Sequence, residues 1–261
     1  VYELIVCVPK AEQEPAAGQF YMIHPVRSNH LLGRPISVYN SVRNANGDVE
    51  VSFLILVKGL GTVELCNLHI DDEVNLLGPC GNRWPVPSLL QNENGGKKVC
   101  IVGGGIGVAP VAGFASTLPE KSYDFFASFK SGSYGLENVK ADKLIITTDD
   151  GSAGIHGMLP AALTVEALKQ GDYSAVYACG PTPMLAYVQK ICAETGLKCW
   201  LSMEARMACG VGVCLGCVID TKEGKKRCCK DGPVFDGSIL DFEVLRKSQG
   251  PEAVVAGIKV Q

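Results

Sequence analysis

Three cysteines in a short glycine-rich segment are the residues of this sequence best suited to chemistry. Cys209, Cys214 and Cys217 follow a C-x4-C-x2-C spacing, and a fourth thiol follows at Cys228 or Cys229. Four thiolates hold a [2Fe–2S] cluster, and this spacing with one later cysteine is typical of such sites. The glycines between them suit a loop that turns backbone N–H groups toward sulfur. The spacing therefore predicts an iron–sulfur cluster, which carries single electrons.

Structural zinc is the main alternative, because zinc also binds four cysteines. Zinc sites mostly take two separated short cysteine pairs, whereas here three thiols lie within nine residues. A disulfide framework fits less well, since a chain of 261 residues can bury a core without covalent staples. The remaining cysteines lie mostly in apolar runs and are expected to be buried, reduced thiols; they are Cys7, Cys66, Cys80, Cys100, Cys179, Cys192 and Cys199.

A glycine turn after a buried-type strand is the second candidate site. The apolar run 97–102 leads into Gly103-Gly-Gly-Ile-Gly-Val-Ala-Pro110, and a helix is expected over Val111–Leu118. A strand, glycine turn and helix in this order let the backbone approach a pyrophosphate at a helix N-terminus. The spacing departs from G-x-G-x-x-G at Val108 and Ala109. We predict nucleotide contacts at Gly103, Gly104, Gly105, Ile106 and Gly107.

The elements that must position this turn alternate between strand and helix patterns. Strands are expected over 124–129, 144–148 and 175–178, and helices over 160–170 and 183–195, which predicts an open parallel α/β sheet. Ligands of such sheets collect at the carboxyl ends of strands. The loops 148–152 and 179–184 lie there, which marks Asp150, Cys179, Gly180 and Pro181; simple βα turns are the alternative. Lys130, not an acidic residue, follows the strand that ends at Phe129, so NAD and NADP both remain open.

The first third of the chain reads as short strands separated by turn signals. Strands are expected over 2–8, 19–24, 37–40, 49–57 and 73–77, with turns at 45–48 and 78–81, which predicts a small antiparallel barrel. Arg34 precedes a proline-fixed bend and Ser37 follows it, so the arginine can pair with a cofactor phosphate. Gly61 and Thr62 are expected to open a helix over 63–67, where an anion can bind. A surface arginine and an ordinary helix cap are the alternative readings.

Seven motifs in order resemble the electron-transfer subunits of class 1B dihydroorotate dehydrogenases, from about residue 2 to residue 242. They are Arg-Pro-Ile-Ser at 34–37, Gly-Thr at 61–62, Gly-Pro-Cys-Gly-Asn at 78–82, Gly-Gly-Gly-Ile-Gly-Val-Ala-Pro at 103–110, Thr-Asp-Asp-Gly-Ser at 148–152, Cys-Gly-Pro at 179–181 and the cysteine segment at 203–217. The chain is thereby identified as a member of the ferredoxin-reductase-like superfamily with an added [2Fe–2S] module.

The resemblance implies a multi-domain β plus α/β fold with its cofactors. It comprises an FAD-binding β-barrel (1–96), a Rossmann-like NAD-binding α/β domain (97–200), an iron–sulfur module (201–242) and a C-terminal tail (243–261). FAD is then expected on Arg34, Pro35, Ile36, Ser37, Leu54, Ile55, Leu56, Gly61 and Thr62. Relatives often carry a basic residue where Leu56 stands, and the nearest cation here is Lys58. The cluster ligands are expected to be Cys209, Cys214, Cys217 and Cys229, because Cys229 begins the family's Cys-x-Asp-Gly-Pro-Val-Phe element.

The implied activity is electron transfer in pyrimidine biosynthesis. A separate FMN-containing catalytic subunit oxidises dihydroorotate, and its electrons pass through [2Fe–2S] and FAD to NAD+, in an expected heterotetramer of two of each chain. A flavin that exchanges pairs of electrons beside a one-electron cluster converts between the two modes. We expect no side chain to act as a nucleophile. The cluster loop with Met203, Met207 and Val213 is the expected contact with the partner, and the tail after Phe242 gives no chemical signal.

The composition excludes several other classes. A net charge of −3 with no polybasic run argues against nucleic acid as a partner. No run of eighteen apolar residues predicts a membrane span, and the first residues read as a strand rather than a signal peptide, so we expect a cytoplasmic protein.

Two rival functions remain. One is the small subunit of an NADH-dependent ferredoxin:NADP oxidoreductase, whose first cluster ligand is typically an aspartate; the other is a zinc-binding sensor without a flavin.

Overall fold

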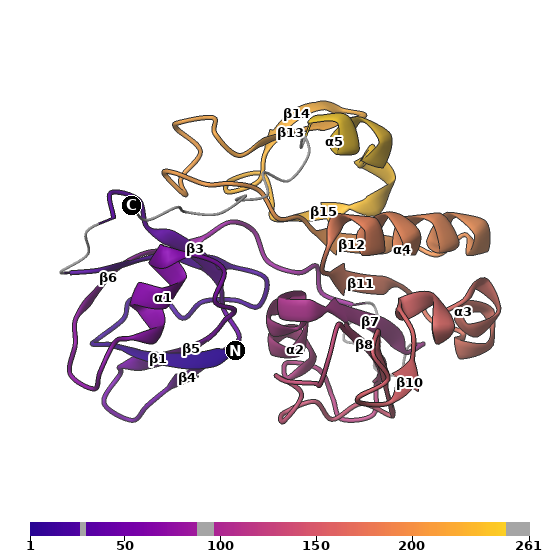
Figure 1. Ribbon diagram of the computed structural model, residues 1–261, viewed down its shortest axis with the longest axis horizontal. Helices are drawn as coiled ribbons and strands as arrows, with labels where there is room; N and C mark the ends of the chain where they lie inside the picture. Colours follow the sequence, from indigo (N-terminus) through magenta and orange to yellow (C-terminus); the bar gives the residue numbers. More distant parts are fainter. Residues whose placement is uncertain (27–29, 88–96, 249–261) are drawn as a thin grey trace, which may run out of the picture.

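The computed structural model describes residues 1–26, 30–87 and 97–248, which form three parts. Figure 1 shows a β domain on one side, an α/β domain on the other, and a smaller C-terminal part that lies over both. Within these residues no helix has the length and apolar character needed to cross a lipid bilayer.

The N-terminal part consists of two three-stranded antiparallel sheets. One has the order β1-β5-β4 and the other β3-β2-β6, with the bounds β1 Tyr2–Val8, β2 Phe20–Pro25, β3 Arg34–Ser37, β4 Asn40–Arg43, β5 Val49–Ile55 and β6 Val74–Cys80. Their inner faces enclose one apolar cluster that includes Tyr21 and Ile23 of β2 and Phe53 of β5. The short helix α1 (Leu60–Cys66) adds Leu65 to this cluster. This is the expected small barrel, with the segment Arg34–Ser37 on an edge strand.

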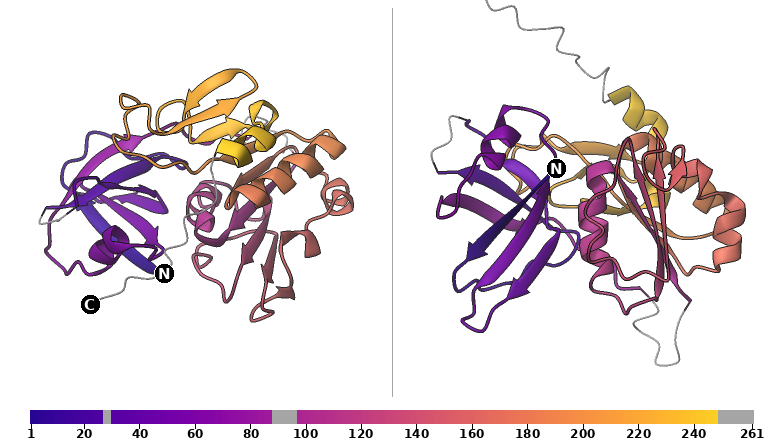
Figure 2. Two further views of the ribbon diagram at one scale, coloured as in Figure 1. Left: turned by 45° about the horizontal axis from the view of Figure 1, so that its top comes forward. Right: turned by 60° about the horizontal axis from the view of Figure 1, so that its bottom comes forward.

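The central part is a doubly wound sheet with helices on both faces. Its order is β10-β9-β8-β7-β11-β12-β15, with the bounds β7 Val99–Gly104, β8 Tyr123–Phe129, β9 Lys143–Thr148, β10 Ile155–His156, β11 Val176–Cys179 and β12 Cys199–Ser202. Helix α2 (Val108–Ala115) lies on the face toward the barrel, and α3 (Val165–Gly171) and α4 (Thr182–Thr195) lie on the other face (Figure 2). All pairs from β10 to β12 are parallel. The chain reverses its direction across the sheet between β7 and β11, where such folds bind their ligands.

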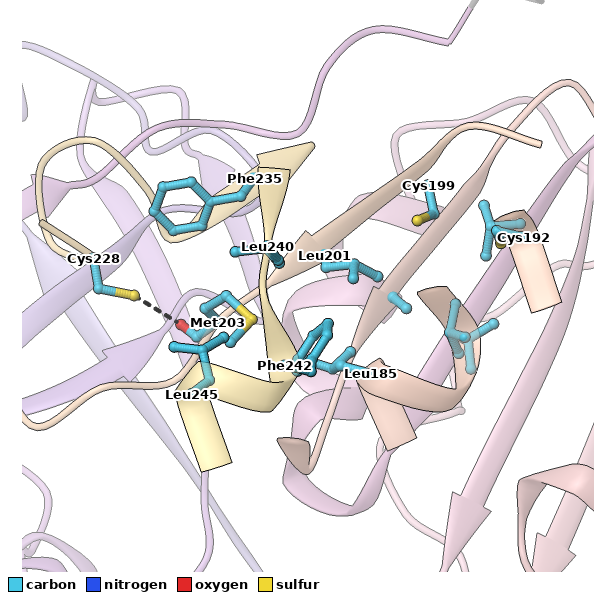
Figure 3. Close-up of a cluster of buried hydrophobic side chains, with 14 of the residues drawn as sticks. Leu185, Cys192, Cys199, Leu201, Met203, Cys228, Phe235, Leu240, Phe242 and Leu245 are labelled. Carbon is cyan, nitrogen blue, oxygen red and sulfur yellow. Dashed lines mark hydrogen bonds between the residues drawn. The ribbon is translucent and has the colours of Figure 1, made fainter. Parts of the chain in front are cut away.

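The C-terminal part is joined to this sheet through a strand and a shared core. Its elements are β13 (Val218–Thr221), β14 (Gly224–Arg227), β15 (Val234–Asp236), the 3-10 turn η4 (Gly237–Ile239) and α5 (Phe242–Ser248). Strand β15 pairs antiparallel with β12 and closes that edge of the sheet. Figure 3 shows Phe235, Leu240 and Phe242 together with Leu201 of β12 and Leu185 of α4 in one buried cluster. The cysteine segment is therefore anchored directly on the nucleotide-binding sheet.

Several expected elements differ from the structure for local reasons. The strand expected over 37–40 is a break between β3 and β4, since Val38 and Tyr39 bond to Gln19 and to Ser52 of the opposite sheets. The turn expected over 78–81 is largely strand, because β6 continues to Cys80 along β2. The helix expected over 160–170 is divided into the 3-10 turn η3 (Leu159–Ala161) and α3, which begins at the cap Thr164.

The start of one helix and the burial of several thiols also differ from the expectation. Helix α2 begins at Val108, three residues before the expected start, because the turn η2 (Gly105–Gly107) leads straight into it. Of the cysteines expected to be buried, Cys7 is exposed, since it points outward from β1, and Cys66 and Cys179 are only half-buried. The segment after Phe242 begins as helix α5, capped by the side chain of Asp241, and Leu245 adds to the core; residues 249–261 lie outside the described part of the chain.

Candidate electron-transfer site

The glycine turn and the Cys-Gly-Pro loop face each other at the point where the sheet order reverses. Gly103 of β7 and Cys179 of β11 are direct partners in the parallel ladder. A Cβ atom on Gly107 would lie 2.6 Å from the carbonyl oxygen of Cys179, so only glycine fits there. Gly180 is similarly close to Gly104. The two predicted nucleotide-binding loops are thus in direct backbone contact at the carboxyl ends of β7 and β11, the position where sheets of this kind bind ligands.

Two further side chains lie against the glycine turn. The thioether of Met184 on α4 would lie 2.4 Å from a Cβ atom on Gly104, so it seals one side of the glycine turn. The hydroxyl of Tyr134 would lie 3.9 Å from a Cβ atom on Gly105, and its ring packs on Phe129 with centroids 4.8 Å apart. Met184 ends the predicted loop 179–184 without having been marked as a contact, and Tyr134 belongs to no motif. Only the fold brings both side chains to the turn.

Asp150 lies on an exposed tip beside the end of β8. Its carboxylate accepts hydrogen bonds from the backbone N–H and the hydroxyl of Ser152, and these bonds lower the pKa of Asp150. Its own N–H donates to the carbonyl of Lys130. The Ser152 hydroxyl also accepts a hydrogen bond from Gly132, so the loops after β8 and β9 are tied together. The structure therefore places the ionised carboxylate of Asp150 in a loop that bonds to Lys130. Lys130 is the residue at which the sequence left the choice between NAD and NADP open.

Cys179 lies close to the start of the cysteine-rich segment. It pairs in register with Ser202 of β12, whose hydroxyl is within hydrogen-bonding reach of the thiol. Burial raises the pKa of Cys179 to about 12, so this thiol is protonated at neutral pH. Glu204 lies two residues beyond Ser202 and forms an exposed ion pair with Lys58 of the barrel at 3.9 Å. The end of β12 thus contacts the Cys-Gly-Pro loop through Ser202 and the barrel through Glu204.

Among the predicted flavin residues, Arg34 and Gly61 are brought into contact. A Cβ atom on Gly61 would lie 1.8 Å from Nε of Arg34, so the arginine side chain crosses the first turn of α1. One guanidinium nitrogen of Arg34 donates to the carbonyl of Leu32 at 2.7 Å. Thr62 uses its hydroxyl locally, because it accepts from the N–H groups of Lys58 and Gly59. Gly61 and Thr62 lie inside the first helical turn rather than before it.

The other predicted flavin residues are more dispersed. Pro35, Ile36 and Ser37 continue the half-buried edge strand β3. Leu54 on β5 faces the α/β domain, where its side chain touches the position of Gly135. Ile55 belongs to the barrel core with 1% exposure, so only its backbone is available to a ligand. Leu56 follows the end of β5 and is half-buried.

The four predicted ligand cysteines form two pairs. Cys209 and Cys214 are in hydrogen-bonding reach of each other, and so are Cys217 and Cys229. The N–H of Cys214 donates to Sγ of Cys209 at 3.5 Å, and the N–H of Cys229 donates to Sγ of Cys217 at 3.4 Å. Throughout 1–26, 30–87 and 97–248, no group of three or more His, Cys, Asp or Glu side chains could hold a metal ion.

Backbone hydrogen bonds favour the thiolate at the first of these cysteines. N–H groups of Cys214 and Val211 point at Cys209 and lower its pKa to about 6. Gly216 donates in the same way to Sγ of Cys214 at 3.4 Å. Burial raises the pKa of Cys229 to about 12, so iron must displace a proton there. Donors aimed at sulfur and a preformed thiolate are what an iron–sulfur cluster requires, and the donor set fits such a group.

The thiol of Cys228 is directed into the core. Cys228 is fully buried, and its thiol donates to the carbonyl of Met203 at 3.3 Å, as the dashed line in Figure 3 shows. Its thiol therefore faces the core while its neighbour Cys229 pairs with Cys217. The spacing alone did not distinguish Cys228 from Cys229 as the fourth ligand, and the orientation of the two thiols supports the choice of Cys229.

The cysteine segment is seated on the barrel as well as on the sheet. A Cβ atom on Gly210 would lie 2.5 Å from the side chain of Met22 on β2, with Sγ of Cys80 at 3.8 Å. Asn82, just after β6, donates to the carbonyl of Val234 and accepts from the N–H of the same residue. Strand β2 also pairs with β3, which carries Arg34–Ser37. One strand therefore separates the predicted cluster loop from the predicted flavin segment.

The comparison with known proteins agrees with this geometry. Residues 204–241 match the family model described as the iron–sulfur cluster binding domain of dihydroorotate dehydrogenase B. The dihydroorotate dehydrogenase B (NAD(+)) electron transfer subunit of Clostridium acetobutylicum is 39% identical over 242 residues, which are 92% of this chain and 91% of that protein. The chain belongs to this family of electron transfer subunits. The corresponding subunit of Clostridium perfringens is 37% identical over 93% of this chain and 92% of its own length.

Solved structures confirm the fold of this electron transfer subunit. A structure of NADH-dependent reduced ferredoxin-NADP oxidoreductase has a TM-score of 0.74 and 25% identity, and covers 96% of this chain and 88% of that one. A ferredoxin NADP+ reductase from Neisseria gonorrhoeae shares the fold with a TM-score of 0.55 and 16% identity, over 74% of this chain and 85% of that one. The predicted family and fold class are thus confirmed, and the chain is an oxidoreductase subunit.

Proposed function

We propose that this chain accepts electrons from an FMN-containing dihydroorotate dehydrogenase catalytic subunit and passes them through a [2Fe–2S] cluster and FAD to NAD+. The dihydroorotate dehydrogenase B relatives, named as electron transfer subunits that use NAD+, support the overall direction. The proposed parts are the flavin barrel 1–96, the nucleotide domain 97–200, the cluster module 201–242 and the tail 243–261. The proposed assembly is a heterotetramer with two copies of each subunit.

The paired thiols favour two irons over one zinc ion. A zinc site takes three or four ligands around one metal ion. In a [2Fe–2S] cluster the four cysteines are shared between two irons, so two pairs are the expected arrangement. Cys209 with Cys214, and Cys217 with Cys229, provide those pairs. These four residues are the proposed ligands.

The proposed cofactor contacts assign each loop a binding task. Bound FAD supplies the exchange of a hydride with nicotinamide and of single electrons with an iron–sulfur cluster. Arg34 would pair with the flavin phosphates over Gly61, and β3 would support the ring through Ser37. The glycine turn and the Cys-Gly-Pro loop would hold the nicotinamide dinucleotide, with the protonated thiol of Cys179 beside the glycine turn.

One observation carries the proposal: the cysteine loop contacts β2, whose neighbouring strand bears the predicted flavin residues. The close approach of Gly210 to Met22 makes this contact tight. This contact would bring a cluster on the loop and a flavin on the barrel to the same side of β2. The exposed side chains Val211, Val213 and Leu215 on the same loop would face the catalytic subunit. Met203, which was expected in this contact, is instead buried in the core, and Met207 packs partly buried against that core.

The test compares the chain alone with the reconstituted complex. The purified chain with FAD and iron should oxidise NADH with ferricyanide, and should show no dihydroorotate oxidation. Adding an FMN-containing dihydroorotate dehydrogenase subunit should create dihydroorotate-dependent reduction of NAD+. A chain that oxidises dihydroorotate alone, or that contains no iron when purified without oxygen, would overturn the proposal.

A second candidate is the small subunit of an NADH-dependent ferredoxin-NADP oxidoreductase. It is favoured by the similarity of the whole fold, with a TM-score of 0.74. The thiol at Cys209 and the higher identity to the dihydroorotate dehydrogenase B subunits favour the first proposal. Steady-state rates with NADH and NADPH, with and without ferredoxin, separate the two functions.

A further inference from the structure

Arg227 at the end of β14 connects the cysteine loop to the segment that carries the last proposed ligand. One guanidinium nitrogen donates to the carbonyl of Gly212 at 3.3 Å. Nε and a second terminal nitrogen bond to both carboxylate oxygens of Asp231, at 3.1 and 3.0 Å. The backbone N–H of Arg227 also donates to Asp231 at 2.7 Å. A planar fork of this kind holds two chain segments in one geometry, which a flexible ammonium group cannot do.

The backbone also brings Arg227 close in the fold to two of the proposed ligands. Arg227 pairs in register with Val218, the residue after Cys217, and Cys229 follows two residues after Arg227. About one third of each side chain in the Arg227–Asp231 pair is exposed, so water screens the pair only in part. The described lysines of the hairpin have other surroundings: Lys222 donates to Ser238, Lys226 pairs with Glu223, and Lys225 is exposed. Just after the hairpin, the side chain of Lys230 packs over Gly212.

We propose that Arg227 is a positioning residue that fixes the cysteine loop through Gly212 and raises the reduction potential of the cluster through its positive charge. The inference rests on the proposed ligand set and goes beyond it. Reduction adds one negative charge to the cluster, and a nearby cation stabilises the reduced form. Asp231 offsets part of this effect, so removing either partner of the pair should move the potential in opposite directions.

Four variants of the full-length chain with FAD and iron separate charge from geometry. Arg227→Gln removes both the charge and the fork. Arg227→Lys keeps the charge and loses the fork. Asp231→Asn leaves the cation without its counter-charge. Lys225→Gln removes an exposed cation of the same hairpin and is the matched control. The readouts are the midpoint potential from an EPR redox titration and the rate of iron release to a chelator.

The expected results differ in sign as well as in size. Arg227→Gln should lower the equilibrium constant for one-electron reduction on the order of tenfold, about 59 mV. Asp231→Asn should raise the potential. Arg227→Lys should keep the potential near the parent value while releasing iron about 10-fold faster, as expected when an outer-shell partner is lost. Lys225→Gln should change neither quantity.

The outcomes keep this inference separate from the proposed function. A parent protein without a [2Fe–2S] EPR signal would overturn the cluster assignment itself. A parent protein with that signal, together with an unshifted Arg227→Gln potential, would overturn the role of Arg227. If Arg227→Gln does not retain its cluster, Asp231→Asn decides, because a potential that stays constant or falls in that variant contradicts the inference.

Discussion

The molecule contains two glycine-rich loops that differ in what their glycines do. In the nucleotide turn, Gly104 and Gly107 have no room for a side chain, because neighbouring backbone and Met184 occupy the space. In the cysteine loop, Gly212 has a φ of +82°, and the nearest neighbour of a Cβ atom there is the flexible side chain of Lys230. The first loop is fixed by close packing, whereas the second is fixed by backbone conformation and by hydrogen bonds to sulfur and from Arg227. We associate the packed loop with the dinucleotide, which binds and dissociates in each turnover, and the hydrogen-bonded loop with the cluster, which remains bound.

The largest effect is expected from Cys214→Ser, which removes a proposed ligand from the bonded loop. Cys214 is exposed, so the core is not disturbed. Iron content should fall, and transfer from dihydroorotate to NAD+ in the reconstituted complex should drop about 100-fold or more. NADH oxidation by ferricyanide should stay within twofold. Cys7→Ser, which changes an exposed cysteine of β1, is the control, and full iron content in Cys214→Ser would contradict the assignment.

Gly107→Ala should impair the packed loop and spare the cluster. The added methyl group would lie 2.6 Å from the backbone oxygen of Cys179. Overpacking of this kind costs about 1–3 kcal/mol, which corresponds to a rise in KM for NADH of roughly 5- to 150-fold. Steady-state kinetics measure this, with Ser133→Ala, on an exposed neighbouring loop, as control. An unchanged KM would show that the dinucleotide binds elsewhere.

Gly212→Ala should weaken the retention of the cluster and leave the KM for NADH unchanged. A left-handed conformation costs a non-glycine residue about 1–2 kcal/mol, so iron release to a chelator should become about 10-fold faster. Gly216→Ala is a matched control, because a Cβ atom there lies 3.5 Å from Sγ of Cys214 and no positive φ is required. Equal release rates in the two variants would remove the distinction between the loops.

The smallest effect is expected from Tyr134→Phe, next to the packed loop. The variant keeps the ring contact with Phe129 and removes a hydroxyl that faces Gly105. Loss of one hydrogen bond to a bound dinucleotide should raise the KM for NADH about 2- to 5-fold without a change in iron content. A KM equal to that of the parent would show that Tyr134 only supports the turn.

The sequence predicted the elements well where one pattern ran without interruption. Strand Tyr2–Val8 has the expected bounds, and β8, β9, β11 and α4 begin within one residue of theirs. Predictions were wrong where long-range pairing decided the outcome. The segment 37–40 divides because its two ends bond to different sheets, and Gly78-Pro-Cys80 stays in β6 because β2 lies alongside it. Such pairings depend on residues far away in the chain, which local propensity does not contain.

The sequence by itself determined the chemistry of this protein, because the type and spacing of Cys209, Cys214 and Cys217 and the order of the glycine motifs already limit the ligands that could bind. Only the tertiary structure decided that the thiols form two pairs, that the Cys228 thiol turns to the carbonyl of Met203, and that Tyr134, Met184 and Arg227 reach the two loops. The reason is geometric: each of these contacts joins segments whose distance is set by the packing of the sheet, the barrel and the C-terminal core, and no local pattern records that distance.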